Sequence, residues 1–342
     1  MVTCRQIAEM VGVSRQAAAS VLNDAPVCLV SPEKKKKILQ LARELHYVRS
    51  NAARTLARGK SGIIGILTGG LHIRKNQLNL ILLDHELRKA GYLPCIVYTR
   101  SEEQHLVNGI HELLRQHADG LIINSIPPEL IESLHKNGLD RLIPTVFVDS
   151  PGKTPLGVHE VFYDYAPYCD GLAEFCRRKK VRNAAAFTCN DNGFYYIHHV
   201  IQQFLPRLGI PCEEFDLIER SHILDPERDR NKLFAGMYEK IAGMKKYDML
   251  IFEQGSAAQS ALWVLQKRSW RVPEDVAVAA FSDFDNCGSF IPALTIPEFS
   301  PETMAEKVWQ MLSRVMRTPD MPPQREGVPL KMLENDTLKN NV

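Results

Sequence analysis

The chain has 342 residues, of which 42 are lysine or arginine and 40 are aspartate or glutamate, so its net charge is +2. Residues 1–61 hold 11 basic and 4 acidic residues, a local charge of +7, whereas the rest hold 31 and 36, a local charge of −5. The composition, 45% hydrophobic and 24% charged, excludes a disordered chain. The charge asymmetry predicts a small nucleic-acid-binding segment ahead of a larger globular part.

The length predicts two or three folded units, because a domain has roughly 100–200 residues. No apolar run approaches the ~20 residues of a membrane span, and the first residues lack the apolar stretch of a secretory signal. The eight cysteines are scattered without a CxxC pair, a pattern that fits neither a zinc framework nor a disulfide scaffold. These observations predict a cytoplasmic protein with no metal ion, no cofactor and no membrane partner.

Two short helices are predicted near the N-terminus. Thr3 can cap a helix over 5–11, and Gly12 ends it because glycine readily takes a positive φ. Ser14 can cap a second helix over 15–23. Two helices joined by a short glycine-containing turn form a helix-turn-helix. Taken alone, this pattern is more common in helical hairpins that have no DNA function.

A third helix is predicted to start at Ser31, which can cap it, and to run to His46. Its first turns carry Lys34–Lys37. Positive charges at a helix N-terminus oppose the helix dipole, so helix stability does not explain this run. Contact with phosphates explains it, and a solvated lysine face is the alternative. Residues 47–61 predict a short basic helix that needs a partner or ligand, because so short a helix is marginal alone in water.

The strings I-A-E-M-V-G-V-S at 7–14, V-L-N at 21–23 and A-R-T-L-A at 53–57, followed by the strand G-I-I-G-I-L, resemble the LacI/GalR family of bacterial transcription regulators. The resemblance implies a helix-turn-helix DNA-binding domain over 1–48 and a hinge helix with linker over 49–61. In that family the second helix enters the major groove, and the paired hinge helices wedge a leucine into the minor groove. Leu56 falls on the leucine position, and Ala53 on the small residue one turn earlier.

The chain departs from the family pattern where DNA is read. The family usually has Thr, Ser and Arg where this sequence has Ala17, Ala19 and Ser20. Arg15 suits guanine and Gln16 suits adenine, so we expect ordinary docking on an unusual operator. The residues predicted to meet DNA are Thr3, Ser14, Arg15, Gln16, Ser20, Asn23, Ser31, Lys34, Lys35, Ala53, Arg54 and Leu56.

From residue 62 onward, apolar β-rich runs alternate with helical stretches. Strands are predicted over 62–67, 93–99, 120–124, 144–149, 184–188, 247–252 and 276–281. Helices are predicted over stretches that include 76–90, 102–117, 165–179, 193–208 and 255–268. Strands that are apolar on both faces and alternate with helices indicate parallel sheets covered on both sides.

So many units favour two doubly wound α/β subdomains that face a ligand-binding cleft, an architecture that the resemblance identifies as periplasmic-binding-protein-like. The effector-binding and dimerisation domain is predicted over 62–334. The first subdomain covers about 62–160 and 291–318, and the second covers about 161–290 and 319–334.

The family's effector residues carry over only in part. Asp149 matches an aspartate that binds sugar hydroxyls in relatives, and Asp164 matches the aspartate that opens the second subdomain. Three usual polar ligands are replaced by neutral groups, so either the effector is not a typical sugar or other residues bind it. The predicted effector residues are Asp149, Asp164, Tyr196, Gln254, Ser282 and Asp283.

The sequence therefore predicts a homodimeric, DNA-binding transcription regulator, a repressor, that binds a near-palindromic operator in double-stranded DNA and responds to a small molecule. It leaves open whether that ligand induces or corepresses. A solute-binding protein without DNA function is the alternative, which the charge of the first 61 residues argues against. An enzyme is a third interpretation, weakened by the absence of a nucleophile–base or metal constellation, so no catalytic residue is predicted.

Overall fold

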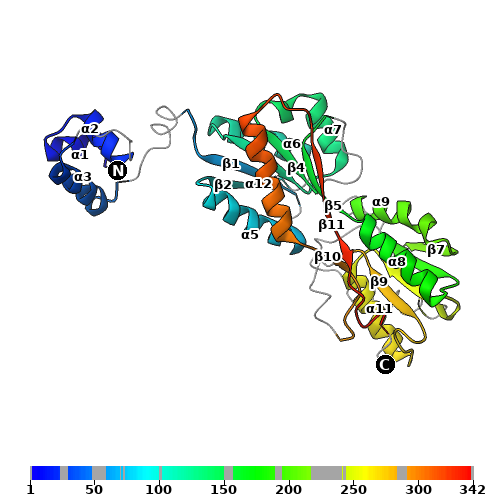
Figure 1. Ribbon diagram of the computed structural model, residues 1–342. Coiled ribbons are helices and arrows are strands. Elements are labelled where there is room, and N and C mark those ends of the chain that lie inside the picture. The colour runs from blue at the N-terminus through cyan, green and yellow to red at the C-terminus, as the bar shows by residue number, and fades with distance from the viewer. Residues whose placement is uncertain are drawn as a thin grey trace. The chain divides into compact units, whose positions relative to one another are not determined.

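The structure, a computed structural model, describes residues 2–23, 30–47, 59–69, 71, 74–99, 102–149, 157–188, 195–216, 241, 244–282 and 291–339 (Figure 1). The chain divides into two compact units. The first comprises Met1–Ile63 with Arg115–Asp119, and the second Ile64–Leu114 with Gly120–Val342.

Within residues 2–23 and 30–47, the first unit contains the helices α1 (Cys4–Val11), α2 (Arg15–Leu22) and α3 (Pro32–Glu44). The hydroxyl of Thr3 accepts the Gln6 amide, and the Gln6 side chain accepts the Thr3 amide, which forms a capping box. Gly12 ends α1 at φ 67°, in the left-handed region, as the sequence predicts.

A small apolar core holds the three helices together. Its seven buried side chains are Ile7, Ala8, Val11, Ala18, Val21, Leu22 and Ile38. Ile38 is the buried residue of α3 and has no exposed surface. Since these three short helices share few buried side chains among the described residues, each of these contacts is expected to be a large fraction of the stability of this unit.

The second unit contains two parallel sheets. The first has the order β11-β5-β4-β3-β1-β2. Its strands are β1 (Ile63–Thr68), β2 (Leu93–Tyr98), β3 (Gly120–Asn124), β4 (Thr145–Val148), β5 (Glu160–Asp164) and β11 (Arg325–Pro329). The helices between them are α5 (Arg74–Lys89), α6 (Glu103–Arg115) and α7 (Pro128–Lys136), with a 3-10 turn, η1 (Leu139–Arg141).

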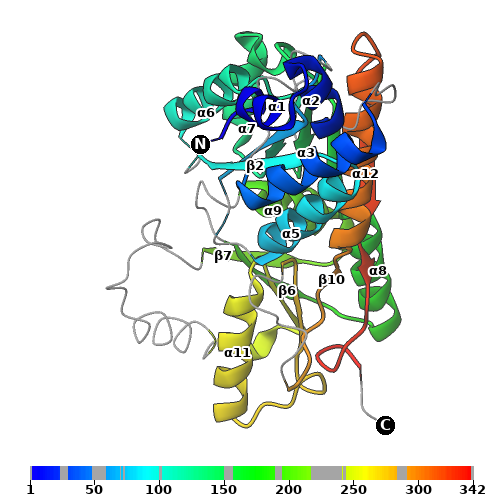
Figure 2. The same ribbon diagram turned by 90° about the vertical axis from the view of Figure 1, so that its left-hand side faces the viewer.

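Helices cover both faces of the first sheet. A methyl group placed on Gly65 would meet Leu113 of α6, whereas one placed on Gly120 would meet Leu312 of α12 (Pro301–Arg317). Figures 1 and 2 both show α5 beside α12, and the two helices pack together. This sheet is doubly wound, as expected from strands that are apolar on both faces.

The second sheet has the order β7-β6-β8-β9. Its strands are β6 (Ala184–Thr188), β7 (Cys212–Asp216), β8 (Met249–Phe252) and β9 (Ala277–Ala280). The associated helices are α8 (Ala166–Lys179), α9 (Tyr195–Phe204) and α11 (Gly255–Lys267), with 3-10 turns η2 (Leu205–Leu208) and η3 (Met244–Lys246). Alternate side chains of β6, β8 and β9 belong to two separate cores, one shared with α8 and the other with α11, so this sheet is also covered on both faces.

The sheets are connected by three crossings of the chain. One follows β5, one follows β10 (Pro297–Glu298), and one links β11 to β12 (Lys331–Met332). Strands β10 and β12 pair antiparallel. The sequence assigns residues after 160 and after 318 to the second subdomain, but β5 and β11 pair with each other in the first sheet. The boundaries therefore lie further along the chain at both places, because a strand belongs to the sheet whose backbone groups it pairs with.

No helix among the described residues is long and apolar enough to span a membrane.

Candidate functional site

The second helix, α2, exposes the side chains predicted to read bases. Arg15 and Gln16 lie exposed in its first turn, directly after the Ser14 cap, whose hydroxyl accepts the Ala17 amide at 3.1 Å. Ser20 and Asn23 are half-buried, and the Ser20 hydroxyl donates to the Ala17 carbonyl at 2.8 Å. Arg15 and Gln16 therefore have the most freedom to reach a ligand.

The lysine run of α3 is exposed at all four positions. Lys34 Nζ lies 3.4 Å from the carbonyl oxygen of Gly12, in the turn between α1 and α2. Ser31 is the N-cap residue of α3, as predicted, but its side chain makes no cap hydrogen bond. Pro32 and Glu33 follow it in the first turn, where the proline ring presets φ and needs no N–H partner.

Several predicted positions lie outside the described residues. They are Ala53, Arg54 and Leu56 of the predicted hinge, and Asp283 of the predicted effector site.

Asp149 lies directly after β4, at the carboxyl edge of the first sheet, with φ 51°. Its side chain is 2% exposed, and Oδ2 accepts a hydrogen bond from Lys75 Nζ. The Lys75 side chain, in the first turn of α5, is itself 9% exposed. These residues form a buried ion pair that sequence reasoning missed, because 74 residues separate them.

Aromatic side chains enclose the Lys75 ammonium. Its nitrogen lies 5.1 Å from the ring centroid of Tyr163 and 5.7 Å from that of Phe299. The two rings meet edge to face at 5.3 Å, and the Tyr163 hydroxyl donates to Asn79 Oδ1 at 2.9 Å. Burial, reinforced by the Asp149 charge, raises the pKa of Tyr163 far above its usual value, so the phenol stays protonated as a donor.

Asp164 ends β5, the neighbour of β4 in the sheet. Its Oδ1 accepts the backbone amide of Ala166 at 3.0 Å, which fixes the start of α8. This contact gives Asp164 a local structural role.

Gln254 and Ser282 lie at the carboxyl ends of β8 and β9 in the second sheet, and Tyr196 belongs to α9. The Ser282 hydroxyl donates to the backbone carbonyl of Glu253 at 2.8 Å. The described predicted residues thus gather in two groups, Asp149 with Asp164 and Gln254 with Ser282, each at the edge of one sheet where ligands of α/β proteins usually bind.

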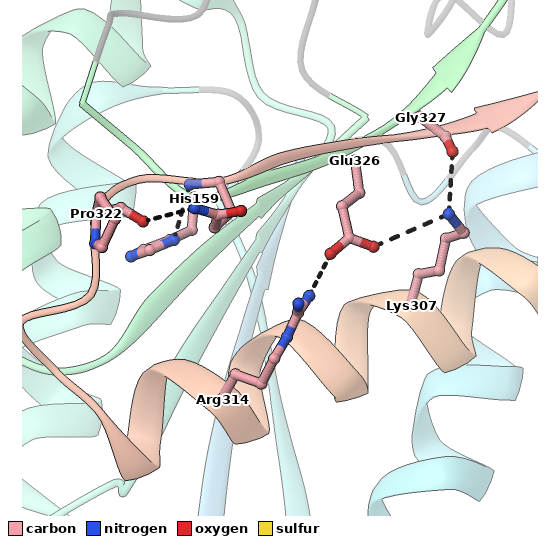
Figure 3. Close-up of polar contacts among 7 residues, drawn as sticks. His159, Lys307, Arg314, Pro322, Glu326 and Gly327 are labelled. Atoms are coloured by element: carbon pink, nitrogen blue, oxygen red, sulfur yellow. Dashed lines mark hydrogen bonds and ion pairs between the residues drawn. The ribbon is translucent and has the colours of Figure 1, made fainter.

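A second polar cluster joins α12 to β11 (Figure 3). Glu326 accepts from Arg314 and lies 3.9 Å from Lys307 Nζ, which also donates to the Gly327 carbonyl at 3.2 Å. A groove of about 330 Å³ next to this cluster is lined by Trp309, Gln310, Ser313, Arg314, Arg317 and Glu326.

Figure 3 also shows His159, whose Nδ1 accepts the backbone amide of Gln324 at 3.2 Å, so this nitrogen is unprotonated. Burial and the nearby Arg314 charge lower the pKa of His159, which favours the neutral ring. Within the described ranges, no group of three or more His, Cys, Asp or Glu residues could hold a metal ion.

Comparison with known proteins agrees with this architecture. Residues 173–337 match the family described as periplasmic binding protein-like domain. The lactose operon repressor of Escherichia coli K12 is 28% identical over 313 residues, which cover 86% of this chain and 79% of that protein. The E. coli K12 catabolite repressor/activator is 24% identical over 281 residues, 81% of each chain. The crystal structure of the Lac repressor dimer bound to operator and the anti-inducer ONPF matches 98% of this chain and 99% of that one, at a TM-score of 0.78 and 19% identity.

A capped helix-turn-helix unit and two doubly wound sheets define a protein with a helix-turn-helix unit and a periplasmic-binding-protein-like body. These curated relatives are transcription repressors and regulators, and the alignments cover most of their length. These relatives agree with the resemblance of the sequence to the LacI/GalR family.

Proposed function

We propose that the protein is a sequence-specific repressor that binds a near-palindromic DNA operator as a homodimer and responds to a small molecule bound to its α/β body. The observation that carries this proposal is the exposed pair Arg15 and Gln16 at the start of α2, held by the Ser14 cap in a segment of charge +7. This arrangement supports insertion of α2 into the major groove, where arginine reads guanine and glutamine reads adenine.

The exposed lysines of α3 supply the sequence-independent part of the binding energy. Lys35, Lys36 and Lys37 form no ion pair with another described residue, so their charge is available for phosphates. Each phosphate contact releases a counterion. The logarithm of the binding constant therefore falls linearly with the logarithm of the salt concentration. The predicted hinge around Leu56 adds the minor-groove contact and a bend in the DNA.

An exposed apolar surface supports the homodimer. Strand β2 lies at the edge of the first sheet and packs beside α5. Four large apolar side chains on these two elements are 41–63% exposed: Ile81, Leu93, Ile96 and Tyr98. Apolar groups gathered on an edge strand and its adjacent helix favour association with another chain over contact with water. A second copy fits because a palindromic operator requires two-fold symmetry.

The carboxyl edges of the two sheets support a small-molecule site in the body. Asp149, Gln254 and Ser282 are all at most 8% exposed there, and buried polar groups at the ends of parallel strands are typical of ligand sites. The relatives are regulators, and we infer that this protein, too, is a cytoplasmic regulator and not an enzyme. Binding at this edge would shift the equilibrium between conformations that differ in DNA affinity.

The test is selection of duplexes from a random pool by the full chain, followed by titration of the selected and a scrambled duplex at several salt concentrations. We expect a palindrome with two half-sites, a steep salt dependence for both duplexes, and tighter binding of the selected one. Arg15→Ala should lose part of the preference for the selected duplex over the scrambled one. Met10→Ala, at an exposed position on α1, should retain this preference. A flat salt response or the absence of an enriched palindrome would refute DNA reading.

A further inference from the structure

Lys75 occupies a position that helix stability cannot explain. It is the second residue of α5, where a positive charge opposes the helix dipole, and it is buried. Burying an ammonium is costly unless it is paired and hydrogen-bonded. Lys89, at the other end of the same helix, shows the ordinary arrangement, with its side chain 71% exposed and 3.7 Å from Glu86.

The surroundings of Lys75 form a cage for an ammonium group. Asp149 supplies a carboxylate, and the rings of Tyr163 and Phe299 lie 5.1 and 5.7 Å from the nitrogen. A carboxylate attracts the charge directly, and aromatic rings attract a cation through their quadrupoles. The Tyr163 hydroxyl is held by Asn79, so the ring is fixed before any ligand arrives.

The same cage contains the carboxylate expected to bind effector. Asp149 holds a left-handed backbone conformation at φ 51°, which strains a residue other than glycine and is frequent at functional sites. Its second oxygen, Oδ1, is buried and accepts no hydrogen bond within the part of the chain that the structure describes. Among the described residues, Lys75 is therefore the side chain that pairs with this carboxylate.

We propose that the Lys75 ammonium is a tethered occupant of the Asp149 cage and determines which ligands the effector edge accepts. A neutral hydroxyl ligand would have to displace an ammonium from a buried carboxylate and leave that charge unpaired, which is strongly unfavourable. The cage therefore selects an ammonium over a hydroxyl, and in the intact chain Lys75 keeps polyol hydroxyls away from Asp149. This inference rests on the proposed effector site but not on the proposed DNA binding.

The experiment removes the tether and supplies the missing atoms as a separate molecule. Lys75→Ala deletes three methylene groups and the ammonium, which together correspond to n-propylammonium. We expect n-propylammonium to raise the thermal midpoint of the full-length Lys75→Ala chain, and to bind it roughly tenfold tighter than 1-propanol, a neutral molecule of the same size. Neither compound should shift the midpoint of the wild type or of Lys89→Ala, the matched surface control on α5. Equal effects of the two compounds, or no effect on a folded Lys75→Ala chain, would overturn the proposal.

A second variant covers the case in which Lys75→Ala does not fold. Lys75→Met keeps most of the apolar stem and removes the charge, and Asp149→Asn removes the opposite charge with little change in shape. If the two side chains act as one occupied site, the double variant is more stable than the sum of the single losses implies. Additive losses would refute the pairing. Selection of a palindromic duplex by the wild type tests the DNA function separately, so the failure of either proposal is recognised without the other.

Discussion

Truncation of Ile38 should unfold the DNA-binding unit and leave the body intact. Ile38 has no exposed surface and is the α3 side chain buried in the core that α1, α2 and α3 share. Ile38→Ala removes three carbon atoms, which corresponds to roughly 2.4 kcal/mol of transfer free energy at ~0.8 kcal/mol per carbon. The cavity left behind brings the expected loss to about 2–5 kcal/mol.

This loss is comparable with the whole stability of so small a unit, since a core of this size supplies roughly 3–5 kcal/mol. We therefore expect Ile38→Ala to lose operator binding at 37 °C and to be cut rapidly by protease within residues 1–47. The thermal midpoint of the α/β body should stay unchanged. Met10→Ala, at a position 56% exposed on α1, is the control and should behave as the wild type. The reasoning would be refuted if Ile38→Ala still bound the operator and the free energy of unfolding of this unit stayed within about 1 kcal/mol of the wild-type value. Ile38 would then not hold the three helices together.

Three further predictions concern recognition, packing and pH. Arg15→Ala should relax specificity at one base pair per half-site, whereas Lys35→Ala should weaken all duplexes alike and reduce the salt slope by about 1, as binding isotherms on single-base variants will show. Gly65→Ala should destabilise the body by about 1–3 kcal/mol in urea unfolding, because the new methyl group would lie 2.8 Å from Leu121 Cδ2; unchanged stability would mean that the sheet relaxes freely. The lowered pKa of His159 means that the unfolded chain binds a proton more readily than the folded one. Stability should therefore fall as the pH drops below about 6.5, and less so in His159→Gln. Parallel pH curves for the two chains would contradict this assignment.

The elements that the sequence predicts best are those with local signals. The strands over 120–124 and 184–188 have the predicted bounds, because apolar residues on both faces require burial between helices. The caps of α1 and α2 follow from Thr3 and Ser14, whose side chains reach amides only three residues away. Such contacts need no information from the rest of the chain.

Strand β5 was not predicted, and its composition explains why. It begins with Glu160 and ends with Asp164, and charged residues at both ends are typical of a loop. In the structure Glu160 is completely buried because Arg325 of β11 pairs with it at 2.7 Å, 165 residues later in the sequence. By contrast, α12 could have been predicted. Ser300, Pro301 and Glu302 form a helix start, and its buried side chains recur at helical spacing.

The candidate site shows the same limit more sharply. Asp149 was expected at the ligand edge because it matches a sugar-binding aspartate of the family that the sequence resembles. Lys75 was not expected there, because a lysine in the first turn of a helix gives no sequence signal of burial. Only the tertiary fold brings Lys75 of α5 to that carboxylate. The chemistry of the edge, an ion pair in place of a free acid, follows from a contact that pattern analysis cannot predict.

The exposed residues of α2 and the buried Lys75–Asp149 pair differ in how they tolerate substitution. Arg15 and Gln16 are exposed, so we expect substitutions there to alter operator preference without a large effect on folding. The sequence already departs from the LacI/GalR pattern that it resembles at Ala17, Ala19 and Ser20, each of which is only half-buried. Lys75 and Asp149 are buried and paired, so a change in one leaves the other charge uncompensated in the interior. With the proposed site residues, operator specificity is expected to evolve one residue at a time, whereas effector specificity at this edge is expected to require both members of the pair to change together.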